Sequence, residues 1–313
     1  MLTKVFFNDR ELRAGWRFAL YVVLVFAVGF GLNLLLRFLL HPSPSAPREF
    51  TATRVIFGDT FLFLIFLVPA LILGRVERRT LGDYGLPARG AFGARFWEGI
   101  LWGFGLQAAT ILLLIALGVC HVSGFAVTAA AGLEYGALWA VAFVLVGFAE
   151  EFGFRGYSQF TLTTGLGFWP AALLLSGGFG LVHLRNAGEN WVGAVGVFFA
   201  AMVLVLPLRR TGALWFSIGV HAGWNWTETF FFGVPNSGTQ AHGYLLNTSF
   251  SGSHWLTGGT VGPEASVVAL ALLALAFLLI HFRFPHAQYP RPGALNPPAR
   301  PTQPAPVITP AAP

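Results

Sequence analysis

The chain has 313 residues, of which 55% are hydrophobic and only 10% are charged, and its mean hydropathy is +0.67. This composition indicates a polytopic membrane protein and excludes an ordinary soluble domain. The net charge of +6 does not indicate a nucleic-acid partner, because the basic residues stand singly or in twos and threes between apolar runs. The single cysteine, Cys120, excludes a disulfide within the chain.

Apolar windows of about 20 residues, the length that crosses a bilayer, recur eight times. We therefore expect an all-α fold, a bundle of about eight transmembrane helices in contact with the lipid bilayer. The windows are Trp16 to Leu40, Val55 to Leu73, Phe96 to Leu117, Ala137 to about Leu162, Trp169 to about Leu184, Trp191 to Leu208, Ala213 to about Phe232, and Ala265 to Phe282.

The distribution of Lys and Arg predicts the orientation of these helices. With the N-terminus inside, fourteen basic residues lie on the cytoplasmic side and four outside, with Arg155 left within the membrane. Cytoplasmic loops carry the excess of positive charge, so we expect an integral protein of the plasma (inner) membrane with both termini in the cytoplasm.

The chain divides into two parts by composition. Residues 1–283 form one eight-span domain, whose polar motifs fall within residues 137–232. Residues 284–313 hold ten of the nineteen prolines, and we expect a disordered cytoplasmic tail there. The stretch from Gly233 to Gly262, rich in Gly, Ser, Thr and Asn, is predicted to be a solvent loop.

An acidic doublet, Glu150 and Glu151, lies inside the fourth window. Ionisable residues in a span are costly and mark functional sites. Glu151 and Arg155 are four residues apart, so they share a helix face and can neutralise each other. Glu150 is rotated about 100° away, which leaves it free to act as a general base or acid. The same carboxylates would also suit a transport or proton-relay site.

Two histidines follow on later spans. Counted from Leu166, Glu150 lies sixteen residues back and His183 seventeen forward, so a helical hairpin turning there brings them to the same depth. Phe179, one turn before His183, would wall the pocket or simply pack. His221 and Asn225 share one face of the seventh span, where both can donate hydrogen bonds to an oxyanion or form a polar clamp between helices.

The ordered motifs Glu150-Glu151-Phe152-Gly153-Phe154-Arg155, Phe179-Gly180-Leu181-Val182-His183 and His221-Ala222-Gly223-Trp224-Asn225 resemble those of the CAAX prenyl protease and bacteriocin-processing family. This family of intramembrane endopeptidases is related to the Ras-converting CAAX endopeptidases. The resemblance implies a helical bundle around a conical cavity that is open to lipid and to the cytoplasm.

The resemblance also implies roles. Glu150 and His183 would activate a water, His221 and Asn225 would stabilise the oxyanion, and Glu151 with Arg155 would shape the site. The substrate would be a membrane-associated protein or peptide. We favour a metal-free, glutamate-dependent reaction without a cofactor. Zinc bound by Glu150, His183 and His221 is the alternative, which the lack of a His-Glu-x-x-His motif weakens.

Other functions fit the sequence less well. No Gly-x-Ser-Gly motif indicates a serine protease, and Asp59 is the only Asp within a span, without the Gly-x-Gly-Asp of an aspartyl type. A proton-coupled transporter would carry polar residues in both halves, whereas here they are confined to spans four, five and seven. A non-proteolytic membrane scaffold or immunity protein stays open as an alternative to the protease.

Overall fold

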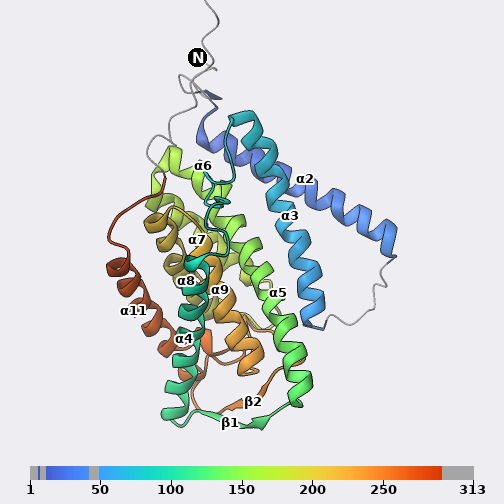
Figure 1. Ribbon diagram of the computed structural model, residues 1–313, viewed down its shortest axis with the longest axis vertical. Coiled ribbons are helices and arrows are strands. Elements are labelled where there is room, and N and C mark those ends of the chain that lie inside the picture. Colours follow the sequence, from blue (N-terminus) through green and yellow to red (C-terminus); the bar gives the residue numbers. More distant parts are fainter. Residues whose placement is uncertain (1–5, 8–11, 42–48, 291–313) are drawn as a thin grey trace, which may run out of the picture.

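The computed structural model describes residues 6–7, 12–41 and 49–290. The described chain is mostly helical (Figure 1). Its α-helices are α2 (Ala14–Leu40), α3 (Ala52–Glu77), α4 (Ala94–Ala116), α5 (Ala129–Arg155), α6 (Tyr157–Leu166), α7 (Phe168–His183), α8 (Trp191–Thr211), α9 (Trp215–Trp226), α10 (His254–Thr257) and α11 (Val267–Arg283). A π-helix η1 (Thr227–Phe231) and a 3-10 helix η2 (Pro263–Ala265) complete the helical elements.

Several helices are long and apolar enough to cross a membrane. These are α2, α3, α4, the α5–α6 run over Ala129–Leu166, and α8, while α7 and α11 are apolar but shorter. Large apolar side chains of α2 point outward, with Phe26 73% and Phe38 74% exposed. Such surfaces are stable only against lipid. The chain is therefore an integral membrane protein.

The fourth predicted span is not one straight helix. It breaks at Gly156, where φ is −83° and ψ −117°, and continues as α6. A straight run of 38 residues would be about 57 Å long, roughly twice the hydrocarbon thickness. The hairpin expected near Leu166 therefore joins α6 to α7, at Gly167, rather than α5 to α7.

Glycines allow α4 and α9 to cross with their backbones in contact. A Cβ on Gly99 or Gly103 of α4 would meet the Phe216 or Val220 carbonyl oxygen of α9 at 2.2 or 2.1 Å. Close approach through small residues is the usual way in which membrane helices associate. The reciprocal contacts come from Gly219 and Gly223 of α9, so the segment that carries His221 is fixed against α4.

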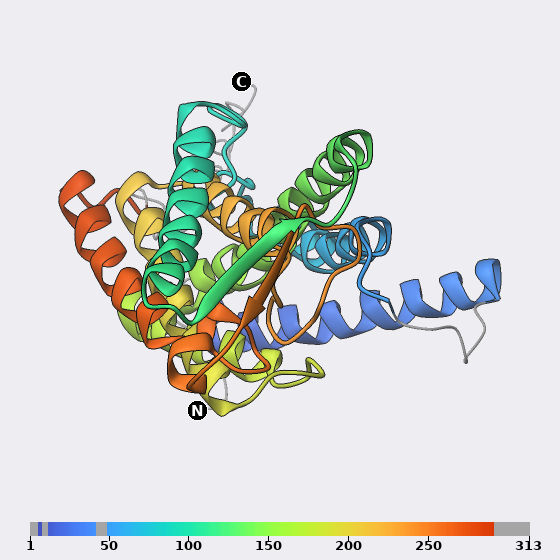
Figure 2. The same cartoon turned by 90° about the horizontal axis from the view of Figure 1, so that it is seen from below.

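A small sheet closes one end of the bundle and was not predicted. Strands β1 (Cys120–Phe125) and β2 (Leu246–Phe250) pair antiparallel, with Cys120 opposite Phe250 and Phe125 opposite Leu246. The sheet lies at the end opposite the first described residues (Figure 1) and crosses under the helices (Figure 2). The fold is thus mostly, not purely, helical.

The prediction of a solvent loop over Gly233 to Gly262 is only partly right: Ser251 to Trp255 are exposed, but the segment also contains β2 and α10, and both of its ends are buried. Val234 and Val261 are fully buried, and the Gly238 N–H donates to the Val261 carbonyl at 2.8 Å. These backbone hydrogen bonds and buried valines hold the segment against the helices. Its polar composition suggested exposure because the sequence does not show that its polar groups bond to one another and face a cavity.

The structured chain also extends past Arg283. Phe284 and Tyr289 are buried, at 6% and 1% exposed. The N–H groups of Gln288 and Tyr289 both donate to the Arg209 carbonyl at the end of α8. Residues 284–290 therefore pack on the bundle, and the rest of the segment for which we predicted disorder, residues 291–313, lies outside the described residues.

Candidate functional site

The acidic doublet of α5 is divided between a buried and an accessible carboxylate. Glu151 is fully buried, and its Oε1 accepts a hydrogen bond from Arg155 Nη1 at 2.9 Å. The expected i,i+4 ion pair therefore forms. Glu150, one residue earlier, keeps 23% of its side chain exposed and lines a cavity. The spacing along the helix thus pairs Glu151 with Arg155 and leaves Glu150 facing the cavity.

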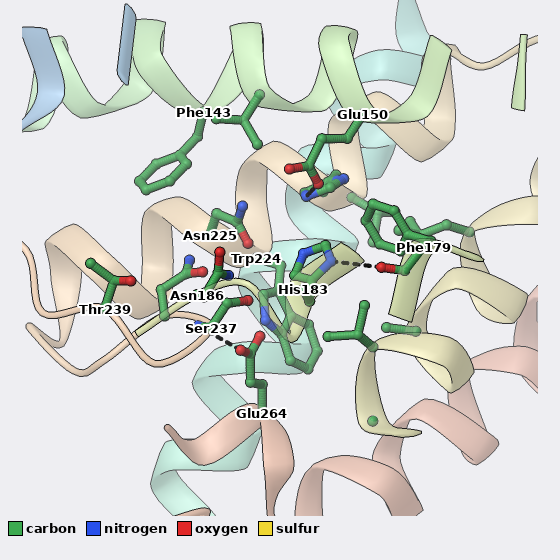
Figure 3. A pocket seen from close by; sticks show the side chains of 18 of the residues that line it. Phe143, Glu150, Phe179, His183, Asn186, Trp224, Asn225, Ser237, Thr239 and Glu264 are labelled. Carbon is green, nitrogen blue, oxygen red and sulfur yellow. Dashed lines mark hydrogen bonds and ion pairs between the residues drawn. The ribbon is translucent and has the colours of Figure 1, made fainter. Parts of the chain in front are cut away.

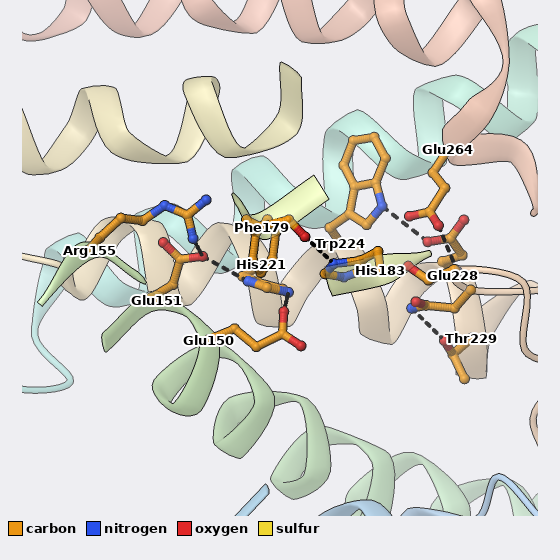
Figure 4. A network of polar contacts seen from close by, with 12 residues as sticks. Glu150, Glu151, Arg155, Phe179, His183, His221, Trp224, Glu228, Thr229 and Glu264 are labelled. Carbon is orange, nitrogen blue, oxygen red and sulfur yellow. Dashed lines mark hydrogen bonds and ion pairs between the residues drawn. The ribbon is translucent and has the colours of Figure 1, made fainter. Parts of the chain in front are cut away.

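His221 of α9 lies between the two carboxylates. Its Nδ1 is 2.9 Å from Glu151 Oε1, and its Nε2 is 3.5 Å from Glu150 Oε2. Together with Arg155 these side chains form a continuous chain of polar contacts (Figure 4). Since an ionised carboxylate only accepts hydrogen bonds, the arrangement suits an imidazole ring that donates from both nitrogens. The sequence did not predict these contacts between His221 and the acidic doublet.

His183, at the end of α7, is held differently. Its Nδ1 is 2.9 Å from the Phe179 carbonyl oxygen of the same helix. A carbonyl accepts only, so Nδ1 carries the proton and the neutral ring has an accepting Nε2. The Phe179 ring packs edge-on against the His183 ring, with centroids 4.5 Å apart. The guanidinium carbon of Arg155 lies 4.8 Å from the centroid of the same Phe179 ring. Phe179 thus links the ion pair to His183.

A cavity of about 350 Å³ brings these residues together (Figure 3). Glu150, Phe179, His183, His221 and Asn225 all line it. They come from α5, α7 and α9, as the motif order predicted. Much of the remaining lining is apolar and comes from α3, α4, α5, α8, α9 and α11: Val55, Leu106, Phe143, Val146, Val197, Ala200, Val203, Leu204, Val220, Trp224 and Leu273.

The cavity has a second, polar side that sequence reasoning missed. Asn186, Asn236, Ser237, Thr239 and Glu264 line it from three connecting segments, which join α7 to α8, η1 to β2, and α10 to α11. Glu264 Oε1 accepts a hydrogen bond from the Ser237 N–H at 2.6 Å. Figure 3 shows His183 between Glu150 and Glu264. Nothing in the local pattern of these loop residues distinguishes them from exposed ones, so no signal was available for them.

Asp59 of α3 was also missed, although a signal existed. It lines the cavity and interacts electrostatically with both Glu150 and His221. An Asp within a predicted span is itself evidence of a functional position. Asp59 served above only to exclude an aspartyl protease, whereas the structure adds it to the cavity as a further carboxylate beside Glu150.

Glu264, on the polar side of the cavity, has a second acidic residue, Glu228, beside it. Glu228, in η1, is fully buried and accepts a hydrogen bond from Trp224 Nε1 at 3.1 Å. Figure 4 shows Glu228 beside Glu264. Burial, together with the nearby Glu189 carboxylate, raises the pKa of Glu264, which lies in η2 before α11, to about 7. Glu264 is therefore partly protonated near neutral pH.

The described residues do not fit the zinc alternative. Across residues 6–7, 12–41 and 49–290, no three His, Cys, Asp or Glu side chains are arranged so that they could hold a metal ion. We therefore derive no step through a metal.

Comparison with known proteins agrees with the motif resemblance. Residues 133–227 match the family described as type II CAAX prenyl endopeptidase Rce1-like. No curated protein matches the chain. The matched stretch contains the helices α5 to α9 that carry Glu150, His183, His221 and Asn225. Residues 133–227 are therefore a domain of the Rce1-like type II CAAX prenyl endopeptidase family.

Proposed function

We propose that the protein is an intramembrane endopeptidase that hydrolyses a peptide bond of a membrane-associated protein or peptide. The observation that carries this proposal is the shared cavity of Glu150, His183, His221 and Asn225. The family of the matched domain supports it. We further propose eight membrane-crossing helices in residues 1–283, in the inner membrane, with both termini in the cytoplasm.

In the proposed reaction, Glu150 and His183 activate a water. Glu150 takes one proton of the water as general base, and the accepting Nε2 of His183 holds the other through a hydrogen bond. The water oxygen then bonds to the carbonyl carbon, and the carbonyl oxygen becomes an oxyanion. The contact between His183 and the Phe179 carbonyl supports this role, because it keeps the proton of the neutral ring on Nδ1.

The oxyanion is stabilised from α9. Asn225 donates from its side-chain amide, and His221 donates from Nε2. Before the reaction His221 Nε2 faces Glu150 at 3.5 Å. Once Glu150 holds the water proton, its neutral carboxyl group is a weaker acceptor than the oxyanion for that donor. Collapse of the intermediate breaks the C–N bond, and Glu150 passes its proton to the leaving amine. Glu151 and Arg155 hold His221 in place throughout.

The test compares the N-termini of membrane proteins in cells that carry the wild-type chain or Glu150→Gln. Glu134→Gln is a matched control, because Glu134 is an exposed acid on the same helix. We expect new N-termini with the wild type and Glu134→Gln but not with Glu150→Gln. Identical N-termini in all three would leave the scaffold, immunity-protein or transporter functions. Activity abolished by chelator and restored by zinc would contradict the metal-free step.

A further inference from the structure

A second and larger hollow, of about 760 Å³, lies away from the site. Its walls come from the segment before α4, the start of α4, the end of α8 and the end of α11 with the residues that follow. The basic residues that line it are Arg89, Arg95, Arg210, Arg283 and His286.

Positive charge dominates this hollow. Four arginines line it, and no Asp or Glu is among the described lining residues. Glu98, just outside, is the acid that pairs with two of them: its Oε2 is 2.9 Å from Arg95 Nη1 and its Oε1 3.2 Å from Arg283 Nε. One carboxylate thus offsets only part of the charge of four guanidinium groups.

The other two arginines lack a carboxylate partner within the described chain. Arg210 donates from Nη1 to the Pro285 carbonyl and from Nη2 to His281 Nδ1, at 2.6 and 2.7 Å. Its buried Nε has no hydrogen-bond partner there. These contacts fix the guanidinium at the wall while leaving its charge uncompensated. Arg89 is exposed at the rim.

The hollow lies at the headgroup level of the membrane. It opens where α8 and α11 end and α4 begins, which is the end that the positive-inside rule assigns to the cytoplasm. Trp97, in the first turn of α4 beside Arg95, is 59% exposed, as expected for a tryptophan at a membrane interface. An acidic lipid headgroup reaches this depth without leaving the bilayer.

We propose that this hollow binds the phosphate group of an anionic lipid. Guanidinium groups match phosphate oxygens in shape and hydrogen bonding, and basic pockets between membrane helices on the cytoplasmic side are typical headgroup sites. The inference does not depend on peptide hydrolysis.

The test measures binding to the purified full chain in neutral detergent, by the shift of the unfolding temperature with ligand concentration. The probes are short-chain phosphatidylglycerol, phosphatidylcholine of the same chain length, and inorganic phosphate. We expect phosphatidylglycerol to bind at least about tenfold more tightly than phosphatidylcholine, since only the former carries net charge. Stabilisation by inorganic phosphate alone would support the phosphate site but identify free phosphate as its ligand.

Four variants locate the site. Arg89→Gln should weaken phosphatidylglycerol binding about fivefold, and the double variant with Arg283→Gln about 30-fold. Glu98→Gln should strengthen binding, because it removes the opposing carboxylate. Arg75→Gln is the control, since Arg75 is exposed at the end of α3 and outside the hollow.

Two results would overturn the proposal. One is equal affinity for the two lipids together with no effect of phosphate. The other is a loss of binding in Arg75→Gln as large as that in Arg89→Gln. The exposed single variant Arg89→Gln keeps the test decisive if the double variant fails to fold.

Discussion

Glu77 at the end of α3 and Glu150 on α5 are both shielded carboxylates of an apolar bundle, but they have different surroundings. Glu77 accepts hydrogen bonds from the hydroxyls of Tyr84 and Tyr157. The Nε atoms of Arg17 and Arg79 lie 3.8 and 4.0 Å from its oxygens. Two cations and two hydroxyls therefore enclose one acid, and only 10% of its side chain is exposed.

Glu150 has one charged neighbour within ion-pair distance in the described chain, His221 at 3.5 Å, and it faces the cavity. Its neighbour Glu151 resembles Glu77, because Arg155 and His221 both bond to it. Pairing with buried cations thus marks a carboxylate that holds helices together, although in Glu151 only Oε1 is bonded and the buried Oε2 has no hydrogen-bond partner among the described residues. Glu150 lies next to a paired carboxylate but is itself open to the cavity, so it can exchange a proton with a ligand.

The largest effect is expected from exchanging the two acids for amides. Glu150→Gln should lower the cleavage rate by about 10² to 10⁴, the contribution of a general base, with little change in unfolding temperature. Glu77→Gln should instead cost about 3 to 5 kcal/mol of stability, because Arg17 and Arg79 lose their carboxylate. Rates per folded molecule and unfolding temperatures in detergent are the measurements. A stable Glu77→Gln protein without activity would contradict the comparison.

The Glu151–Arg155 ion pair tests whether a carboxylate paired with a buried cation stabilises the fold. Glu151→Gln should destabilise the protein by about 3 to 5 kcal/mol, since it leaves a buried guanidinium without its charge partner. Adding Arg155→Met removes that cation, so the double variant should be more stable than Glu151→Gln alone. Chemical denaturation of the wild type, the single variants Glu151→Gln and Arg155→Met, and the double variant measures this coupling. Strictly additive losses would mean that the two side chains act independently.

The next prediction concerns Asn225, the proposed hydrogen-bond donor to the oxyanion. Asn225→Ala should lower kcat by about 10² to 10³, the loss typical of one oxyanion donor, and leave KM nearly unchanged. The matched control is Asn247→Ala on β2, an exposed position outside the cavity. A rise in KM with normal kcat would instead assign Asn225 to substrate binding.

The smallest effect concerns Glu264, whose burial raises its pKa to about 7. A carboxyl with a folded-state pKa above its unfolded value stabilises the protein at low pH, and this contribution is lost as pH rises through the folded pKa. The free energy of unfolding should therefore fall, by at most about 3 kcal/mol, as the pH rises from the ordinary carboxyl value of 4.5 through about 7, and the unfolding temperature should fall with it. Glu264→Gln should flatten this slope. An unchanged slope in the variant would assign the pH dependence to other groups.

Features that depend on helix geometry could be predicted from the sequence. The four-residue spacing of Glu151 and Arg155 gave their ion pair, and hydrophobic length indicated the long membrane helices. These two predictions needed only residue spacing and the rise of a helix. The gathering of the three motifs at one cavity was expected from their resemblance to the CAAX prenyl protease and bacteriocin-processing family, because the depth count for Glu150 and His183 assumed a hairpin that the break at Gly156 alters.

Features that depend on long-range contacts could not be predicted. The contact of His221 with both carboxylates requires the rotation of α9 relative to α5, which the α4 crossing fixes. The break at Gly156 and the inward fold of residues 233–262 arise from packing partners distant in sequence. Ser237 and Glu264 therefore looked like ordinary loop residues although they line the cavity.

The backbone contact between α4 and α9 also limits how the protein can be re-engineered. A methyl group at Gly99 or Gly219 would collide with a main-chain oxygen of the opposite helix at 2.2 Å, so neither position tolerates enlargement. Redesign of the cavity for a larger substrate should therefore leave the α4–α9 contact unchanged. The side chains of Asn236, Ser237 and Thr239, which line the cavity away from this contact, are the part to redesign, whereas Gly238 between them has a φ of +76° and leaves no room for a Cβ.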